Sequence, residues 1–170
     1  MQEGAEIKFW FAAKTRFGQE LKVKSRLQDA SIEHFIPTGI RKNYRGNPKE
    51  YPLVHNLVFI RTTKEVACAL KTEWGLPLIY LFDYANHTML TVPDKQMEDF
   101  IRVFEVTEQD KKLLSVPLEP GDKVRIVRGP LMGVEGIVQE MDGKSYVGVT
   151  LIGCVFARAL VSRVDMEKVE

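Results

Sequence analysis

Residues 120–138 read PGDKVRIVRGPLMGVEGIV. A glycine–aspartate pair opens a run of β-branched residues, and a glycine–proline pair ends it at a turn. A later glycine permits a second turn, and a last one stands inside the next strand-like run, where two backbones approach closely. These turn and approach positions are Gly121, Asp122, Gly129, Pro130, Gly133 and Gly136. The segment predicts short strands joined by tight turns, as in a small β-barrel.

Short strand-like runs continue to the end of the chain, at residues 123–127, 136–140, 146–151 and 156–161. Glycines and an Asp142-Gly143 pair separate most of them, and such pairs are typical of hairpin turns. We therefore expect a β-barrel domain over residues 118–170.

The part of the chain before this barrel has a mixed pattern. An aromatic-rich strand is expected at 7–15, a helix at 19–30, strands at 32–36 and 53–60, a helix at 64–73, a strand at 78–82, and a helix after Pro93. The polar residues 106–117 are the best linker candidate. The fold class is thus α+β, with an N-terminal sheet-and-helix domain at 1–105, a linker at 106–117 and the β-barrel at 118–170.

Composition limits the function classes. The 170 residues include 24 basic and 23 acidic ones and are 45% hydrophobic, which favours a folded chain over a disordered one. No apolar stretch is long enough to span a membrane and the start lacks a secretory signal, so we expect a cytoplasmic protein with no membrane partner. Cys68 and Cys154 are expected to be buried thiols rather than a disulfide pair.

Positive charge is concentrated near the N-terminus. Residues 8–49 contain ten basic and three acidic residues, a balance of 10 − 3 = +7. Part of this charge lies on one face of the expected helix, at Lys22, Lys24 and Arg26. Another part lies at 41–49, a polar tip that also holds Tyr44, and the strands on either side of it predict a long hairpin with a basic end. A charged tip is often a solvated loop, but basic residues beside an aromatic ring also suit nucleic acid, and both interpretations stay open.

No catalytic constellation is present. His34, His55 and His87 have no metal-ligand spacing, so neither a metal nor a cofactor is expected. Gly143-Lys144-Ser145 lacks the first glycine of a phosphate-binding loop, because Val138 stands at that position. We expect a protein that is not an enzyme.

The segment at 120–138 resembles the KOW motif, which introduces a small SH3-like β-barrel. With it, the opening WFAAKTRFGQE at 10–20 resembles the NusG family of transcription elongation factors, and the order of domains is similar too. The strand PLVHNLVFI at 52–60 resembles a family strand but departs from it at Val54, His55 and Leu57.

The resemblance implies a factor that binds the clamp helices of RNA polymerase and promotes processive elongation. The residues it implies for this contact are apolar: Leu57, Phe59, Met97 and Phe100. Each of them is equally well explained as ordinary core. Through the KOW domain, the resemblance implies a ribosomal protein or the termination factor Rho as a partner.

Specialised paralogues such as RfaH and the UpxY antiterminators also read non-template DNA from the first loop and helix. The residues at matching positions here are Arg16, Gln19, Lys22 and Arg26. This basic face favours an operon-specific antiterminator over a general housekeeping elongation factor. A ribosome-associated RNA-binding KOW protein is the alternative from another class, but acidic residues outnumber basic ones in 118–170, which disfavours general phosphate binding.

Overall fold

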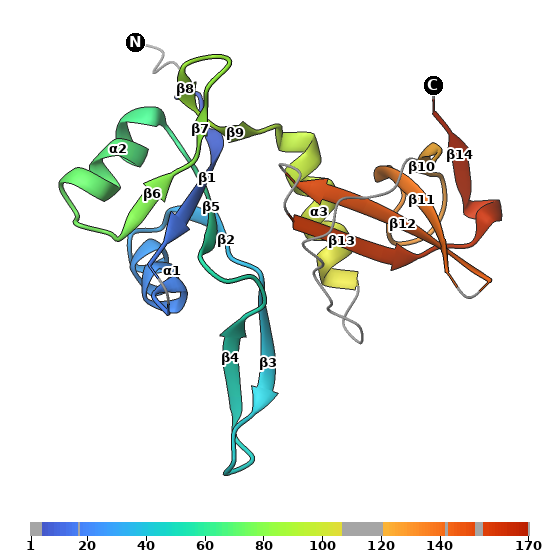
Figure 1. Cartoon of the computed structure of the whole chain (residues 1–170), viewed down its shortest axis with the longest axis horizontal. Helices are drawn as coiled ribbons and strands as arrows, with labels where there is room; N and C mark the ends of the chain where they lie inside the picture. The colour runs from blue at the N-terminus through green and yellow to red at the C-terminus, as the bar shows by residue number, and fades with distance from the viewer. Residues whose placement is uncertain (1–4, 17, 107–120, 142, 152–154, 170) are drawn as a thin grey trace. The chain divides into compact units, whose positions relative to one another are not determined.

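The computed structural model describes residues 5–16, 18–106, 121–141, 143–151 and 155–169. The chain divides into two compact units, an N-terminal unit, Met1–Asp94, and a C-terminal unit, Lys95–Glu170. Figure 1 shows the elements of each unit in chain order.

A five-stranded antiparallel sheet organises the N-terminal unit. Its strands are β1 (Phe9–Thr15), β2 (Glu33–Phe35), β5 (Leu57–Thr62), β6 (Leu78–Tyr80) and β9 (Thr91–Val92). The order is β2-β5-β1-β6, and β9 also pairs with β1. Two helices accompany the sheet, α1 (Glu20–Asp29) and α2 (Lys64–Thr72). The expected helices at 19–30 and 64–73 and the expected first strand are therefore confirmed.

The core of this unit lies between the helices and one face of the sheet. Ala13 on β1 and Val58 and Ile60 on β5 pack with Leu27 of α1 and Leu70 of α2, and all five are fully buried. The strand register explains why these strand residues face the helices, because Ala13 lies opposite Val58 and side chains two residues apart share a face of the sheet. Cys68, expected to be buried, is exposed on α2, because Ala67 and Leu70 form the buried side of that helix. Cys154 lies outside the described residues.

A buried carboxylate fixes the junction between α1 and β5. Glu20, in the first turn of α1, is almost fully buried and accepts a hydrogen bond from the backbone N–H of Asn56 at 2.8 Å. Asn56 has a φ of 63°, a left-handed conformation that asparagine tolerates better than most residues. This turn explains why β5 starts at Leu57 and not at residue 53, as the sequence pattern suggested.

Two hairpins extend from the sheet. The longer one joins β3 (Thr38–Lys42) to β4 (Pro48–Pro52), and the shorter one joins β7 (Phe82–Asp83) to β8 (Thr88–Met89). The expected long hairpin with a basic end is therefore present, with β2 and β5 pairing at its base. In Figure 1, β3 and β4 project away from the sheet and helices of their unit.

The C-terminal unit combines one helix with a second antiparallel sheet. The helix is α3 (Asp94–Val106), and the strands are β10 (Lys123–Ile126), β11 (Glu135–Met141), β12 (Lys144–Leu151), β13 (Val155–Leu160) and β14 (Met166–Lys168), with the short 3-10 helix η1 (Arg163–Asp165) before the last. The order is β13-β12-β11-β10-β14. Among the described residues no pairing joins β13 to β14, so this sheet is open and does not form the closed barrel that we expected.

Two glycines of the 120–138 segment are required by close backbone packing. A Cβ atom on Gly136 would lie 2.5 Å from the carbonyl oxygen of Gly148 on β12, and one on Gly121 would lie 2.6 Å from that of Val138. Both distances are shorter than side-chain atoms tolerate. The expectation that Gly136 permits close approach inside a strand is therefore confirmed.

The helix α3 falls in the C-terminal unit, although the predicted domain boundary placed it before a linker at 106–117. Residues 107–117 of that linker lie outside the described residues. Within the described part of the chain, no helix is both long and apolar enough to cross a bilayer.

Candidate interaction surfaces

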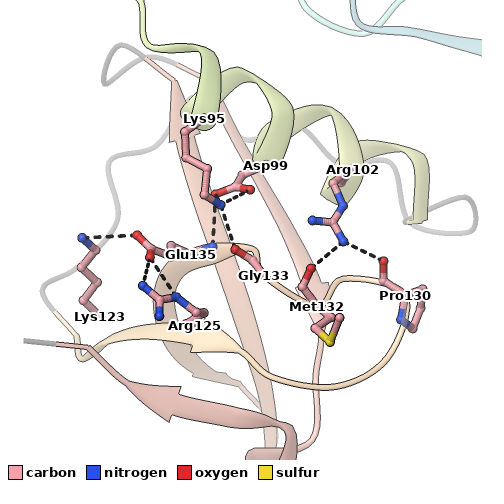
Figure 2. Close-up of polar contacts among 9 residues, drawn as sticks. All are labelled: Lys95, Asp99, Arg102, Lys123, Arg125, Pro130, Met132, Gly133 and Glu135. Carbon is pink, nitrogen blue, oxygen red and sulfur yellow. Dashed lines mark hydrogen bonds and ion pairs between the residues drawn. The ribbon is translucent and has the colours of Figure 1, made fainter.

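Side chains of α3 are hydrogen-bonded to the connection between β10 and β11 (Figure 2). Lys95 Nζ donates to both carboxylate oxygens of Asp99, at 2.7 and 2.8 Å, and to the carbonyl oxygen of Gly133 at 2.8 Å. Asp99 is only 4% exposed and also accepts from the backbone N–H of Glu135 at 3.2 Å. Asp99 therefore binds a side chain of its own helix and the start of β11 at once.

Arg102, further along α3, binds the same connection. Its Nη2 donates to the carbonyl oxygen of Met132 at 2.7 Å and to that of Pro130 at 3.1 Å. Gln96 makes a separate contact, because its Nε2 donates to the carbonyl oxygen of Thr150 on β12 at 2.6 Å. The helix is thus held on the C-terminal sheet by polar contacts along its length.

The conformation of the connection supplies these carbonyl acceptors. Gly129 and Gly133 have φ values of 87° and 90°, which residues with a side chain rarely adopt. The N–H of Met132 donates to Gly129 and the N–H of Gly133 donates to Ile126, which folds the connection on itself. The carbonyl groups of Pro130, Met132 and Gly133 then accept hydrogen bonds from α3.

Glu135 adds a charge cluster beside this contact, in which Glu135 is half-buried and its cationic partners are exposed. Arg125 donates to Glu135 Oε1 through Nη2 at 2.6 Å and through Nε at 3.0 Å, and Lys123 Nζ lies 3.7 Å from Oε2. The hydrogen bonds from Arg125 lower the pKa of the Glu135 carboxyl group, with a smaller contribution from the charge of Lys123. Because both cationic partners of Glu135 are exposed to solvent, the cluster contributes little stability.

The apolar residues predicted to contact RNA polymerase form two pairs. Leu57 and Phe59 stand two residues apart on β5, so they share the sheet face opposite Val58. Met97 and Phe100 stand three residues apart on α3 and so lie on one side of the helix. All four are buried, so contact with a partner requires that they be uncovered. Their role in binding stays a prediction.

The residues predicted to contact DNA lie at and after the end of β1. Arg16 is exposed, and Gln19 is the half-buried residue that precedes α1. Lys22 and Arg26 are exposed one helical turn apart on α1. Lys24, which the sequence placed on the same basic face, instead forms an ion pair with Glu50 of β4.

The contacts of α3 were missed by sequence reasoning. One signal was available, because Asp99 lies one helical turn from the apolar Val103, and a carboxylate buried beside it needs a partner. Backbone carbonyl acceptors, in contrast, leave no mark in a sequence. In the described part of the chain, no three His, Cys, Asp or Glu residues come together as a possible metal site.

Comparison with solved structures returned several matches. One, from work on domain interaction in Thermotoga maritima NusG, is 23% identical, covers 98% of this chain and 100% of the other, and has a TM-score of 0.49. The MjSpt4:Spt5 complex in conformation A is 12% identical, with coverages of 94% and 97% and a TM-score of 0.28. No curated protein matched significantly.

A family model described as transcription termination factor nusG matches residues 8–101. The match begins just before β1 and ends inside α3, so it includes the whole N-terminal sheet together with α1 and α2. It covers more than half of the 170 residues. The chain therefore belongs to the NusG family.

Proposed function

We propose that this protein is a transcription elongation and antitermination factor that binds RNA polymerase through its N-terminal domain and promotes processive elongation. The observation that carries the proposal is the family match over residues 8–101, which includes every predicted polymerase and DNA residue. A factor of this kind acts by binding and not by catalysis. It favours the processive state of polymerase because it binds that state more tightly than the paused one.

The proposed polymerase surface consists of Leu57, Phe59, Met97 and Phe100, and its target is the clamp helices. The apolar character of the four side chains supports this contact, because side chains of this kind gain about 1.5–3 kcal/mol each when they are removed from water. Since all four are buried in the free protein, binding exchanges one apolar environment for another. The net binding free energy from each side chain is then smaller than about 1.5–3 kcal/mol, because the free energy needed to uncover the residue is subtracted from it.

Operon specificity is proposed from the cationic residues near α1. Arg16, Lys22 and Arg26 are exposed, as a contact with non-template DNA requires, and the half-buried Gln19 lies between them in sequence. Such residues position a protein on phosphates and also donate to base edges. The C-terminal segment, residues 118–170, is proposed to be a KOW domain that binds a ribosomal protein or Rho, on the support of its glycine pattern at Gly121 and Gly136.

The test is single-round transcription by RNA polymerase on templates with pauses and a terminator, with and without the full chain. We expect faster elongation or greater read-through, together with association of the chain with polymerase. If the chain changes neither quantity on any template and does not bind polymerase, the proposal is wrong, and salt-dependent RNA binding by the C-terminal segment becomes the hypothesis to pursue.

A matched pair of variants tests the polymerase surface. Phe100 and Phe104 are both buried on α3 with stacked rings, their centroids 6.4 Å apart, but only Phe100 belongs to the proposed surface. We expect Phe100→Leu to weaken polymerase association more than Phe104→Leu, while both variants lose a similar amount of stability. Equal association of the two variants would remove Phe100 from the surface.

A further inference from the structure

We propose that the tip of the β3–β4 hairpin binds single-stranded nucleic acid, with Arg41, Lys42, Arg45 and Lys49 on the phosphates and a base stacked on Tyr44. This site is separate from the residues near α1 and does not depend on polymerase binding. It rests on the charge, the exposed aromatic ring and the internal order of the hairpin, which projects from its unit in Figure 1.

The charge of the tip is uncompensated. Residues 40–49 contain four basic residues and no acidic one, and all four are exposed. Among the residues that the structure describes, none of the four side chains forms an ion pair or a hydrogen bond, whereas Lys24, Arg61 and Arg125 elsewhere are paired. Phosphate binding requires cations of this kind, because their charge is free to neutralise that of the nucleic acid.

The arrangement of the charges opposes fold stability. Arg41 on β3 lies directly opposite Lys49 on β4, so two positive side chains are cross-strand neighbours. Like charges in this position destabilise a hairpin. Arg41 also lies over the ring of Tyr51, with its guanidinium carbon 4.8 Å from the ring centroid, a contact that leaves its positive charge unneutralised. A polyanionic partner that bridges Arg41 and Lys49 accounts for the two neighbouring charges.

An aromatic ring stands among the cations. Tyr44 is 89% exposed, and the Arg45 guanidinium carbon lies 5.2 Å from the centroid of its ring. Aromatic rings at such positions stack with unpaired bases, and an adjacent arginine strengthens the contact. The faces of bases in a duplex are already stacked on one another, so the exposed ring favours a single strand.

The tip has a defined backbone. Asn43 Oδ1 accepts from the N–H groups of Arg45 at 2.9 Å and Asn47 at 3.0 Å, and Gly46 closes the turn with a φ of 80°. At the base of the hairpin, Glu50 accepts from Lys24 of α1 and from Thr38 Oγ1 of β3. The arm is therefore ordered before it binds, which lowers the entropic cost of binding.

The test measures fluorescence anisotropy of labelled single-stranded DNA, single-stranded RNA and duplex DNA with the purified full chain over a range of salt concentrations. Four phosphate contacts to a single strand predict a slope of about −2.8 for log affinity against log salt, or a loss of roughly 50-fold between about 50 and 200 mM. We expect single strands to bind more tightly than the duplex. The comparison of DNA with RNA then identifies which single strand the tip prefers.

Charge-matched variants locate the site. The hairpin variant replaces Arg41, Lys42, Arg45 and Lys49 by Gln, and the control replaces four exposed cations elsewhere by Gln: Lys64, Lys71, Arg128 and Lys144. We expect the hairpin variant to flatten the slope by about 2.8 while the control leaves it unchanged. If both variants weaken binding equally, the tip is not a site and the proposal fails.

The aromatic contact has its own variants. Tyr44→Ala should weaken single-strand binding by about 5- to 150-fold, the range for loss of one stacked base, and Tyr44→Phe should preserve it. Thermal unfolding verifies that each variant folds, and the single Tyr44 variants remain informative if the fourfold variant does not. Tighter binding of duplex than of single strands, or full affinity in Tyr44→Ala, would overturn the assignment. Because every variant retains Arg16, Lys22 and Arg26 and no polymerase is present, the effect of the hairpin substitutions is distinguishable from the contacts of the proposed function.

Discussion

Replacement of Asp99 by alanine should loosen the C-terminal unit while leaving the N-terminal unit unchanged. The substitution removes the carboxylate that accepts from Lys95 and from the backbone N–H of Glu135. Since Asp99 is buried, water cannot fully replace it as an acceptor at this N–H group.

The magnitude follows from the two contacts. A partly buried N–H without an acceptor costs about 1–3 kcal/mol. Loss of the pair with Lys95, an i,i+4 contact whose lysine side chain is 57% exposed, adds about 0.3–0.5 kcal/mol. The higher helix propensity of alanine returns roughly 0.6 kcal/mol. We therefore expect the free energy of unfolding of the C-terminal unit to fall by about 1–3 kcal/mol.

Hydrogen exchange is the suitable assay because it resolves the two units. The amide of Glu135 and those of β11 should exchange about 5- to 150-fold faster in Asp99→Ala. Trp10 and Trp74 both lie in the N-terminal unit, so urea unfolding followed by tryptophan fluorescence should be unaltered. The control is Glu98→Ala, an exposed carboxylate on the same helix. An exchange rate at Glu135 within twofold of wild type would refute the bridging role of Asp99.

Three further predictions concern packing and pH. Gly136→Ala places a methyl group 2.5 Å from a backbone oxygen of β12, so circular dichroism should show the C-terminal sheet lost or strongly destabilised. The control Gly143→Asn should fold, because an added Cβ at this turn meets no heavy atom within 4 Å. The hydrogen bond from Lys24 lowers the pKa of Glu50. The stability that the ionised carboxylate contributes is therefore present at neutral pH and is lost as the pH falls through the folded-state pKa. The unfolding free energies of wild type and Glu50→Gln should differ by at most about 1 kcal/mol at pH 7 and converge in acid. Burial raises the pKa of Tyr80, whose hydroxyl donates to the carbonyl oxygen of Ala67 at 2.6 Å. Because of this hydrogen bond, the free energy of unfolding of the wild type should exceed that of Tyr80→Phe by about 1 kcal/mol at neutral pH. The difference should disappear as the pH rises above about 10, where the hydroxyl of the unfolded chain ionises.

Elements with strong local signals could be predicted from the sequence. The strand β1 and the helices α1 and α2 were expected within a few residues of their observed bounds, and α3 begins directly after Pro93, as expected. Their apolar residues repeat at strand or helix spacing, and glycine or proline stands near their ends. The two-residue strands β7, β8 and β9 were missed, because so short a segment has no period and exists only through its pairing with a neighbour.

The candidate surfaces show the same division between local and tertiary information. Sequence reasoning located the exposed cations Arg16, Lys22 and Arg26, because charge is a property of single residues. It placed Lys24 with them, but a partner 26 residues away removes it from that face. It also left open whether the apolar residues were core or contact surface, and their burial alone does not distinguish the two roles.

The polar contacts of α3 connect the stability of the C-terminal unit with the proposed function. The family match ends inside α3, yet its side chains Lys95, Asp99 and Arg102 bind the connection between β10 and β11. If polymerase takes the side of α3 that holds Met97 and Phe100, it competes with the contacts that now bury them. If the state in which these residues are uncovered lies about 1–3 kcal/mol above the observed state in free energy, the apparent affinity for polymerase falls by about 5- to 150-fold. Asp99→Ala would then lower the stability of the C-terminal unit and raise the apparent affinity for polymerase, because the contact that stabilises this unit also restrains the helix that polymerase is proposed to bind.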